Sequence, residues 1–439
     1  MENSKTLTVL LCILTSVLVQ IFLPHLLGVL RSLSCSYFEN CGNPVTTDLA
    51  ARITTLPDLL TRHRAEYESG VVLKRHDADP VSPTLEKEAL SAVSAAQSYR
   101  QNGNFKKAKI VIEHAISLLP HHPDVLTERG LIFEHLDNFI EADLCYVKAL
   151  VYNPAHRRAL ERRRRTQPIV NAADQKLLNE IDQKKEAFNR LAHTTTLRRA
   201  MRESYFSHIY HTVAIEGNTL SLGETRSILE TGFVVPGKSI VEHNEVIGMD
   251  SALRYLNSSL LNLNEITLDD ILEIHRRVLG NVNPIDGGRI RSTQVYVGRF
   301  TPVAPEYVRE QMEELIEWLN SPLTAEIDPV ERAAIAHYKL VLIHPFVDGN
   351  GRTARLLLNL ILMKCGFPPV ILPVETRAEY YAVLNTANLG DLRPFVRYVA
   401  KHTADTLQHY ISLSTTSCST GLCNSVISPE EPQTIVSSP

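Results

Sequence analysis

Residues 344–355 read His-Pro-Phe-Val-Asp-Gly-Asn-Gly-Arg-Thr-Ala-Arg. This short run combines a proton acceptor, His344, with a carboxylate, Asp348, and two arginines, Arg352 and Arg355. The planar guanidinium carries a permanent charge and fits phosphate oxygens, and Mg²⁺ usually needs only one or two carboxylates besides its substrate's phosphates. The run therefore predicts an active-site loop for phosphoryl or nucleotidyl transfer rather than a structural turn.

The residues around this loop predict where it lies. Gly349 and Gly351 let backbone N–H groups approach a phosphate without a Cβ in the way. Residues 356–363 are almost entirely apolar and predict a buried helix. The loop would then lie at that helix's N-terminus, where unpaired N–H groups and the helix dipole favour an anion. It is not a Walker P-loop, because no Lys-Ser or Lys-Thr pair follows the glycines.

The run resembles the loop of the Fic family, His-Pro-Phe-x-Asp-Gly-Asn-Gly-Arg-x-x-Arg, at all nine specified positions. The resemblance implies an enzyme that transfers AMP from ATP to a Ser, Thr or Tyr hydroxyl of a protein. His344 would be the general base, since a pKa of about 6.5 suits proton abstraction at neutral pH. Asp348 would hold Mg²⁺ (or Mn²⁺) against the phosphates, and Arg355 would contact the γ-phosphate.

The resemblance also assigns the nucleotide-binding residues. Alternating β-branched and aromatic residues over 293–302 predict a short β-hairpin. In the family this hairpin is a flap that aligns the target segment by strand addition and covers the nucleotide. A downstream helix covers adenine in the family, although packing on a helix surface would explain its tyrosines equally well. The candidate nucleotide-binding residues are Val297, Gly298, Arg299, Phe300, Asp348, Gly349, Asn350, Gly351, Arg352, Thr353, Ala354, Arg355, Tyr380, Tyr381 and Asn388.

A second motif lies upstream. Residues 212–218, Thr-Val-Ala-Ile-Glu-Gly-Asn, match the inhibitory-helix motif of Fic proteins through Glu216 and Gly217. A lone glutamate on a helix is usually a solvated surface residue, but here it accompanies the complete loop. The resemblance implies that Glu216 pairs with Arg355 and misaligns ATP. It also implies a second catalytic role for Glu216, positioning a water that removes AMP from the modified target while His344 protonates the leaving hydroxyl.

A 34-residue period marks residues 89–156, where Ala108 recurs as Ala142 and Pro120 as Pro154. The period and the small residues predict two tetratricopeptide helix pairs. Alanines allow close helix packing, and the prolines end each second helix. Two interpretations remain open: structural packing, or a groove for a protein partner.

Composition and periodicity divide the chain of 439 residues into six segments. They are a transmembrane segment (1–31), a stem (32–86), the two tetratricopeptide helix pairs (87–156), a linker helix (157–204), the Fic domain (205–410) and a disordered tail (411–439). The fold class is therefore mostly α, with an all-helical Fic domain that carries a short β-hairpin flap. Helices within that domain are predicted at 267–280, 306–319 and 330–343.

The N-terminal segment has no Asp, Glu, Lys or Arg between Thr6 and Leu30. It is close to the length of a bilayer span, and we favour a retained signal anchor over a cleaved signal peptide. Cys35 and Cys41 could pair in an oxidising lumen, and Asn257 begins a glycosylation sequon, Asn-Ser-Ser. With the resemblance, these features imply a single-pass type II protein of the endoplasmic reticulum membrane with a lumenal catalytic domain.

The resemblance implies partners as well. The endoplasmic-reticulum members of the family act on BiP, the lumenal heat-shock chaperone, which the tetratricopeptide pairs would dock. Larger members form homodimers, and residues 240–247 are a candidate contact, although a buried helix face explains them equally well. The net charge of −4 does not favour nucleic-acid binding.

Two rival functions need comparing with AMP transfer. The first is a phosphotransferase of the related Doc type, which moves the γ-phosphate of an inverted nucleotide. Doc-type loops depart from the pattern in its second half, whereas residues 351–355 match it here. The second is a non-enzymatic membrane adaptor, which a missing His344 or Asp348 would have supported; both are present.

Overall fold

The computed structural model describes residues 82–191, 195–298 and 300–419, with side chains up to residue 413. This part of the chain is mostly helical and contains no β-sheet, which confirms the mostly α fold class. No helix within it is long and apolar enough to cross a membrane. The predicted transmembrane segment, the Cys35–Cys41 pair and the end of the predicted tail lie outside the described residues.

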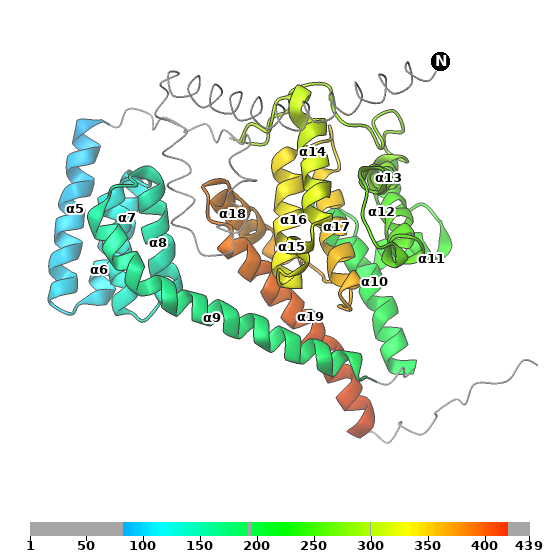
Figure 1. The fold of residues 1–439 in the computed structure, drawn as a ribbon, viewed down its shortest axis with the longest axis horizontal. Helices are drawn as coiled ribbons and strands as arrows, with labels where there is room; N and C mark the ends of the chain where they lie inside the picture. The colour runs from blue at the N-terminus through cyan, green and yellow to red at the C-terminus, as the bar shows by residue number, and fades with distance from the viewer. Residues whose placement is uncertain (1–81, 192–194, 299, 420–439) are drawn as a thin grey trace, which may run out of the picture. The chain divides into compact units, whose positions relative to one another are not determined.

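Two helix pairs occupy the region of the predicted repeats (Figure 1). They are α5 (Pro83–Gln101) with α6 (Phe105–Leu118), and α7 (Pro123–His135) with α8 (Phe139–Tyr152). The 34-residue period reappears in the helix caps, because the side chains of Asn104 and Asn138 both accept a backbone N–H at the N-terminus of the second helix of a pair. The first helix begins at Pro83, so the predicted stem, residues 32–86, extends four residues too far. Proline favours the first turn of a helix, because its fixed φ suits that position and its missing N–H is not needed there.

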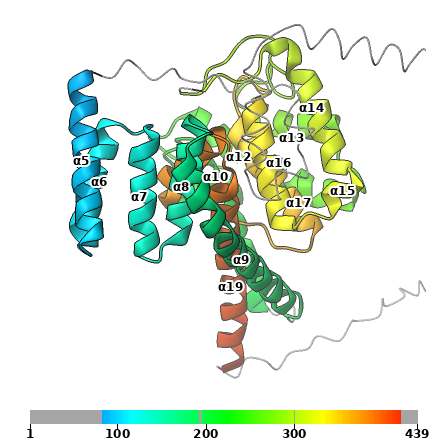
Figure 2. The same cartoon turned by 60° about the vertical axis from the view of Figure 1, so that its left-hand side comes forward.

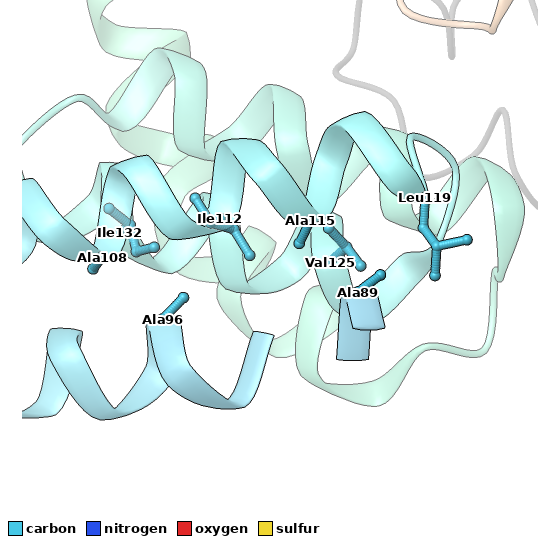
Figure 3. Close-up of a cluster of buried hydrophobic side chains, with 8 residues drawn as sticks. All are labelled: Ala89, Ala96, Ala108, Ile112, Ala115, Leu119, Val125 and Ile132. Carbon is cyan, nitrogen blue, oxygen red and sulfur yellow. The ribbon is translucent and has the colours of Figure 1, made fainter. Parts of the chain in front are cut away.

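Small side chains bring these helices together. Ala108 and Ala142, the repeated alanines, are completely buried. Figure 3 shows the cluster that joins α5, α6 and α7; its members are Ala89, Ala96, Ala108, Ile112, Ala115, Leu119, Val125 and Ile132. In the second pair Gly130 leaves room for the Tyr146 ring, which a Cβ at that position would hit. Close packing around alanine and glycine therefore explains the small-residue period.

The predicted linker helix 157–204 is wrong at its C-terminal end. Helix α9 (Arg157–Asn189) stops at the C-cap Arg190, and α10 (Thr195–Ile215) begins before residue 205. The helix that carries the inhibitory motif therefore starts within the segment assigned to the linker.

The remaining helices form the domain that holds the loop, and they appear in Figures 1 and 2. In chain order they are α11 (Leu222–Thr231), α12 (Ile240–Ser258), η1 (Leu260–Asn262), α13 (Leu268–Leu279), α14 (Pro305–Asn320), α15 (Pro322–Ala325), α16 (Pro329–Ile343), α17 (Asn350–Lys364), η2 (Val374–Thr376), α18 (Arg377–Asn388) and α19 (Arg393–Ser419). The three helices predicted from periodicity are confirmed as α13, α14 and α16, with each end within one residue.

Helices α16 and α17 pack against each other and place the loop between them. The apolar run 356–363 lies within α17, as predicted; its residues 356–362 are buried, and Met363 is half-buried. A helix that is apolar on every side belongs in a protein interior. The N-terminus of α17 is therefore held firmly by the core, and the loop with it.

Helix α19 continues to Ser419, so residues 411–419 are helical and not part of a disordered tail. It packs along α9 (Figures 1 and 2). Two ion pairs accompany this contact: Arg393 with Asp143 of α8 at 2.7 Å, and Arg397 with Asp174 of α9 at 2.6 Å. The helix pairs and the domain that holds the loop are thus joined through α9 and α19.

The candidate dimer segment is only partly buried. Val246 of α12 is completely buried, whereas Ile240, Val241 and Ile247 are exposed. The segment therefore combines a core face with exposed apolar side chains, and its role in a dimer stays a prediction.

Candidate active site

His344 closes α16 with an unusual backbone. It is the C-cap residue and is left-handed, with φ of 52°. Its Nδ1 lies 3.2 Å from the carbonyl of Val341. A carbonyl can only accept, so Nδ1 carries the proton and Nε2 keeps a lone pair. Burial lowers the pKa of His344, and the nearby Arg291 charge lowers it as well. The ring is therefore neutral at neutral pH and able to accept a proton.

The loop after His344 is fastened by its own side chains. Asn350 accepts from the amide of Phe346 at 3.0 Å and donates to its carbonyl at 2.9 Å. Gly349 precedes α17 with φ of 79°, which glycine tolerates best. The backbone N–H groups at 350, 351 and 352 have no hydrogen-bond acceptor among the described residues. The start of α17 is therefore a set of free donors suited to phosphate oxygens, as the sequence predicted.

His275 of α13 supports the loop and was missed by the sequence analysis. Its ring stacks on Phe346, with centroids 3.6 Å apart. Its Nε2 lies 2.9 Å from the Asp348 carbonyl, and its Nδ1 accepts from the Gly288 amide at 3.0 Å. Burial lowers the pKa of His275 to about 4, so the ring stays neutral and keeps both contacts. A single histidine among apolar helix residues carries no sequence signal that would distinguish it from a core residue.

Arg352 is buried between two carboxylates. Its guanidinium contacts Asp348 at 2.8 Å and Glu245 at 3.1 Å. Glu245 also accepts from Asn218, the last residue of the predicted inhibitory motif, at 2.8 Å. We expected Arg352 to contact the phosphates of the nucleotide. In the structure its guanidinium instead pairs with the two carboxylates. Only Asp348, with 64% of its side chain exposed, faces solvent.

Glu216 and Arg355 form the predicted contact. Arg355 Nη2 lies 2.6 Å from Glu216 Oε1 and also donates to the Thr212 carbonyl at 2.9 Å. Burial disfavours the charged guanidinium, but the Glu216 carboxylate outweighs it, so the pKa of Arg355 is raised. The carboxylate also lies against Gly351, where an added Cβ would collide with it. Glu216 therefore occupies space beside the phosphate cradle.

Tyr380 does not cover an open nucleotide site. It is 2% exposed, and its hydroxyl contacts His337 Nε2 at 2.9 Å and Arg355 Nη1 at 3.4 Å. It therefore supports Arg355 from the interior. Tyr381 is exposed, and Asn388 is half-buried and accepts from Tyr338 at 3.2 Å. The adenine role of these two residues stays a prediction.

Thr353 and Ala354 are completely buried on α17, and their contact with a nucleotide stays a prediction. Asn257 is exposed near the end of α12, and its glycosylation stays a prediction. No group of three or more potential metal ligands from His, Cys, Asp and Glu occurs in the part of the chain that the structure describes.

The predicted hairpin is reduced to one antiparallel bridge. Val297 and Phe300 exchange two backbone hydrogen bonds of 2.9 Å around Gly298, which has φ of 58°. Arg299 lies outside the described residues. The two exposed residues Tyr296 and Val297 show that this turn reaches solvent. We call residues 293–302 the flap.

The comparisons with known proteins agree with this geometry. The model of the Fic/DOC family matches residues 265–362, which include the loop and the flap but not Glu216. Protein adenylyltransferase fic-1 of Caenorhabditis elegans is 62% identical over 354 residues, covering 80% of this chain and 70% of the relative. The chain belongs to the Fic family of protein adenylyltransferases. Protein adenylyltransferase Fic of Nematostella vectensis is 50% identical over 341 residues, covering 77% and 79% of the two chains.

A solved structure of C. elegans Fic-1, residues 134–508, has a TM-score of 0.72 and 61% identity, covering 75% of this chain and 99% of that chain. Fic adenylyltransferases use ATP as their substrate. The free N–H groups of α17, the neutral His344 and the exposed Asp348 are the parts of this chain that such a substrate would meet.

Proposed function

We propose that this Fic protein transfers AMP from ATP to hydroxyl groups of a protein target, that Glu216 inhibits the transfer, and that the same site removes AMP again. The Glu216–Arg355 ion pair carries the regulatory part of the proposal, because it joins the motif on α10 to the loop on α17.

In the transfer reaction His344 Nε2 takes the proton of the target hydroxyl. The oxygen then attacks the α-phosphorus of ATP; a new P–O bond forms, the bond to the β-phosphate bridging oxygen breaks, and pyrophosphate leaves. The N–H groups at the start of α17 bind the oxygens on which charge accumulates. The lone pair on Nε2 and the depressed pKa of His344 support its role as the base.

Asp348 fits a divalent cation that arrives with ATP. Its carboxylate is exposed, and one carboxylate suffices when phosphates supply other ligands. Mg²⁺ (or Mn²⁺) would neutralise phosphate charge there. Arg352 stays neutralised when Asp348 turns towards a cation, because Glu245 remains as its second carboxylate.

Glu216 inhibits transfer in two ways: its carboxylate occupies space beside Gly351 where the phosphates of ATP would lie, and it neutralises the Arg355 charge that would bind the γ-phosphate. While Arg355 is paired with Glu216, it cannot serve the γ-phosphate, and the carboxylate next to Gly351 repels the phosphates. ATP can still bind, but misaligned for attack; a displacement of about 1 Å can cost about 100-fold in rate.

The reverse reaction uses the same residues. A water attacks the phosphorus of the AMP-modified side chain while Glu216 accepts its proton. The bond from phosphorus to the side-chain oxygen breaks and AMP is released. His344 takes part in its protonated form, in which Nε2 carries a proton that it donates to the leaving oxygen. The position of Glu216 above Gly351 supports this role.

The target that we propose is BiP in the lumen of the endoplasmic reticulum, docked by the helix pairs α5–α8. The protein would be a homodimer anchored in that membrane by its N-terminal segment. The apolar residues between Thr6 and Leu30 and the exposed apolar side chains of α12 support anchoring and dimerisation. The sequon at Asn257 agrees with a lumenal, glycosylated protein.

The decisive experiment uses the full chain as wild type, Glu216→Gly and His344→Ala, with BiP and ATP labelled on the α- or the γ-phosphate. We expect α-label on BiP, stronger with Glu216→Gly and absent with His344→Ala. Glu230→Gly, which removes an exposed glutamate of α11, is the control and should behave as wild type. Label from the γ-phosphate would instead indicate a Doc-type kinase, and no label would favour another target or the adaptor.

Removal of AMP is tested separately with BiP that already carries labelled AMP. Wild type should release the label, whereas Glu216→Gly should not. Equal release by both proteins would exclude Glu216 as the group that positions the water.

A further inference from the structure

Arg291 lies in the loop between α13 and the flap, and 3% of it is exposed. Its Nε donates to the His344 carbonyl at 2.7 Å, and its own amide donates to the Pro345 carbonyl at 2.9 Å. Its Nη1 donates to the Thr293 carbonyl at 3.0 Å. Its Nη2 donates to the Val303 carbonyl at 2.5 Å and to the Ile343 carbonyl at 3.4 Å. One side chain thus contacts four carbonyls in three segments.

This guanidinium has no carboxylate partner within ion-pair distance in the described part of the chain. Burial lowers the pKa of Arg291, yet an arginine remains charged in proteins. A buried charge without a counter-ion is costly. An apolar side chain would fill a core position at a lower cost, so the carbonyl contacts themselves are the reason for an arginine here.

The first segment that Arg291 holds is the catalytic base. A non-glycine residue in the left-handed region costs about 1–3 kcal/mol and persists only where its surroundings enforce it. His344 is such a residue, and its carbonyl is fixed by Arg291 Nε. The positive guanidinium also complements the C-terminal dipole of α16 through the Ile343 and His344 carbonyls.

The other two contacts lie at the base of the flap. Thr293 is the first residue of the flap, and Val303 directly follows its last residue. The two ends are also joined to each other, since Gln294 donates to the Pro302 carbonyl at 3.1 Å. The exposed tip of the flap therefore has a base that is tied to the same guanidinium as His344.

We propose that Arg291 is a positioning residue that couples the flap to the catalytic loop, so that a protein segment aligned on the flap presents its hydroxyl to His344. This inference rests on the proposed function for the role of the flap. The coupling itself requires only the contacts between Arg291 and the three segments.

The test uses the full chain in the Glu216→Gly background, with Arg291→Gln and Arg291→Lys. The control is Arg289→Gln, which removes an exposed arginine of the same loop. We measure kcat and KM for BiP with α-labelled ATP, ATP affinity by calorimetry, and backbone hydrogen exchange of residues 293–302.

We expect Arg291→Gln to lose about 100-fold in kcat/KM for BiP, since the base and the target are misplaced. Arg291→Lys should lose less, because it keeps the positive charge, although it lacks the several donors of the guanidinium. ATP affinity should stay within a few-fold, because its donors lie on α17. The Val297 and Phe300 amides should exchange about tenfold faster, as expected for losing one hydrogen bond to a charged group.

Two results would overturn the proposal. The first is that the Arg291 variants show the same turnover and the same hydrogen exchange as Arg289→Gln. The second is that they lose ATP binding as well as turnover, which would mean that Arg291 maintains the fold in general rather than the position of the flap. The exchange measurement needs no activity. If Glu216→Gly alone fails to label BiP, the proposed function fails, while exchange still decides whether Arg291 holds the flap.

Discussion

The hydrogen bond from His344 Nδ1 to the Val341 carbonyl decides which ring nitrogen can act as a base. It leaves Nε2 unprotonated in the neutral ring. Burial is the largest cause that lowers the pKa of His344 from 6.5, and the Arg291 charge lowers it further, although the bond to the Val341 carbonyl acts in the opposite direction.

The pH dependence of transfer follows from that shift. Only the deprotonated ring can accept the hydroxyl proton, and a lowered pKa keeps it deprotonated to lower pH. In the Glu216→Gly variant we therefore expect kcat/KM to be level near neutral pH and to reach half its maximum below pH 6.5. A profile from about pH 5 to 8 checks this. A midpoint above the ordinary histidine value would contradict the assignment of His344 as a buried neutral base.

A second prediction at the scale of a residue concerns the hydroxyl of Tyr380, which contacts Arg355. An arginine cannot accept a hydrogen bond, so the Tyr380 oxygen accepts from Arg355 and its proton points to His337. Without Glu216, Arg355 keeps only Tyr380 and the Thr212 carbonyl. Tyr380→Phe in the Glu216→Gly background should therefore weaken ATP binding by about tenfold.

Calorimetric titration with ATP measures that effect. The control is Tyr398→Phe, whose hydroxyl bonds Thr376 at 2.7 Å instead of the arginine. Identical ATP affinities for the two phenylalanine variants would show that Tyr380 does not position Arg355.

At the scale of the element, helix α17 begins with the N–H groups that we propose to bind phosphate, and most of the residues that follow are buried. Two asparagines of this helix hold adjoining backbone in the same way. Asn350 bonds both backbone groups of Phe346, and Asn359 bonds both backbone groups of Val370. Only the first of these contacts shapes the loop.

This pair offers a matched test. Asn350→Asp and Asn359→Asp each replace a buried donor with an acceptor that faces a carbonyl, and each should cost about 1–3 kcal/mol in the free energy of unfolding. Asn350→Asp should also weaken ATP binding by at least about tenfold, whereas Asn359→Asp should not. Urea unfolding and ATP titration of both variants are the measurements. If Asn350→Asp and Asn359→Asp bound ATP with equal affinity, the contact between Asn350 and Phe346 would not be needed for nucleotide binding.

At the scale of the whole described chain, the helix pairs and the catalytic helices meet through buried charges. Arg393 of α19 contacts Asp143 of α8 at 2.7 Å and Asp391 at 2.8 Å, and all three are nearly inaccessible. Thr166 of α9 completes the network by donating to Asp143 at 2.7 Å. Removing Arg393 would leave two buried carboxylates without their ion-pair partner.

Arg393→Met should therefore destabilise the protein by about 3–5 kcal/mol and uncouple the two groups of helices. We expect urea unfolding to change from one transition to two, with the helix pairs unfolding first. Arg397→Met is the control, because its partner Asp174 is 22% exposed and its loss should cost less. A single transition at the wild-type midpoint would mean that the network does not couple them.

The sequence predicted most of what is local. The loop chemistry lies within residues 344–355, and its internal contacts span only four positions, from Asn350 to Phe346 and from Arg352 to Asp348. Helix periodicity placed α13, α14 and α16 to within a residue. Where the prediction was wrong, at the end of α9 and of α19, polar residues at a helix end gave no strong periodic signal.

The sequence by itself determined the family, the helical class, and the base, carboxylate and phosphate donors of the loop, because these depend on residue type and short spacing. The resemblance implied the contact between Glu216 and Arg355, which spans 139 positions. Only the tertiary structure brought Glu245 to Arg352 across 107 positions and His275 to Asp348 across 73. It also moved Tyr380 inside and assigned four carbonyls to Arg291. Periodicity reports which face of a helix is buried, but it carries no information about which distant residue that face will meet.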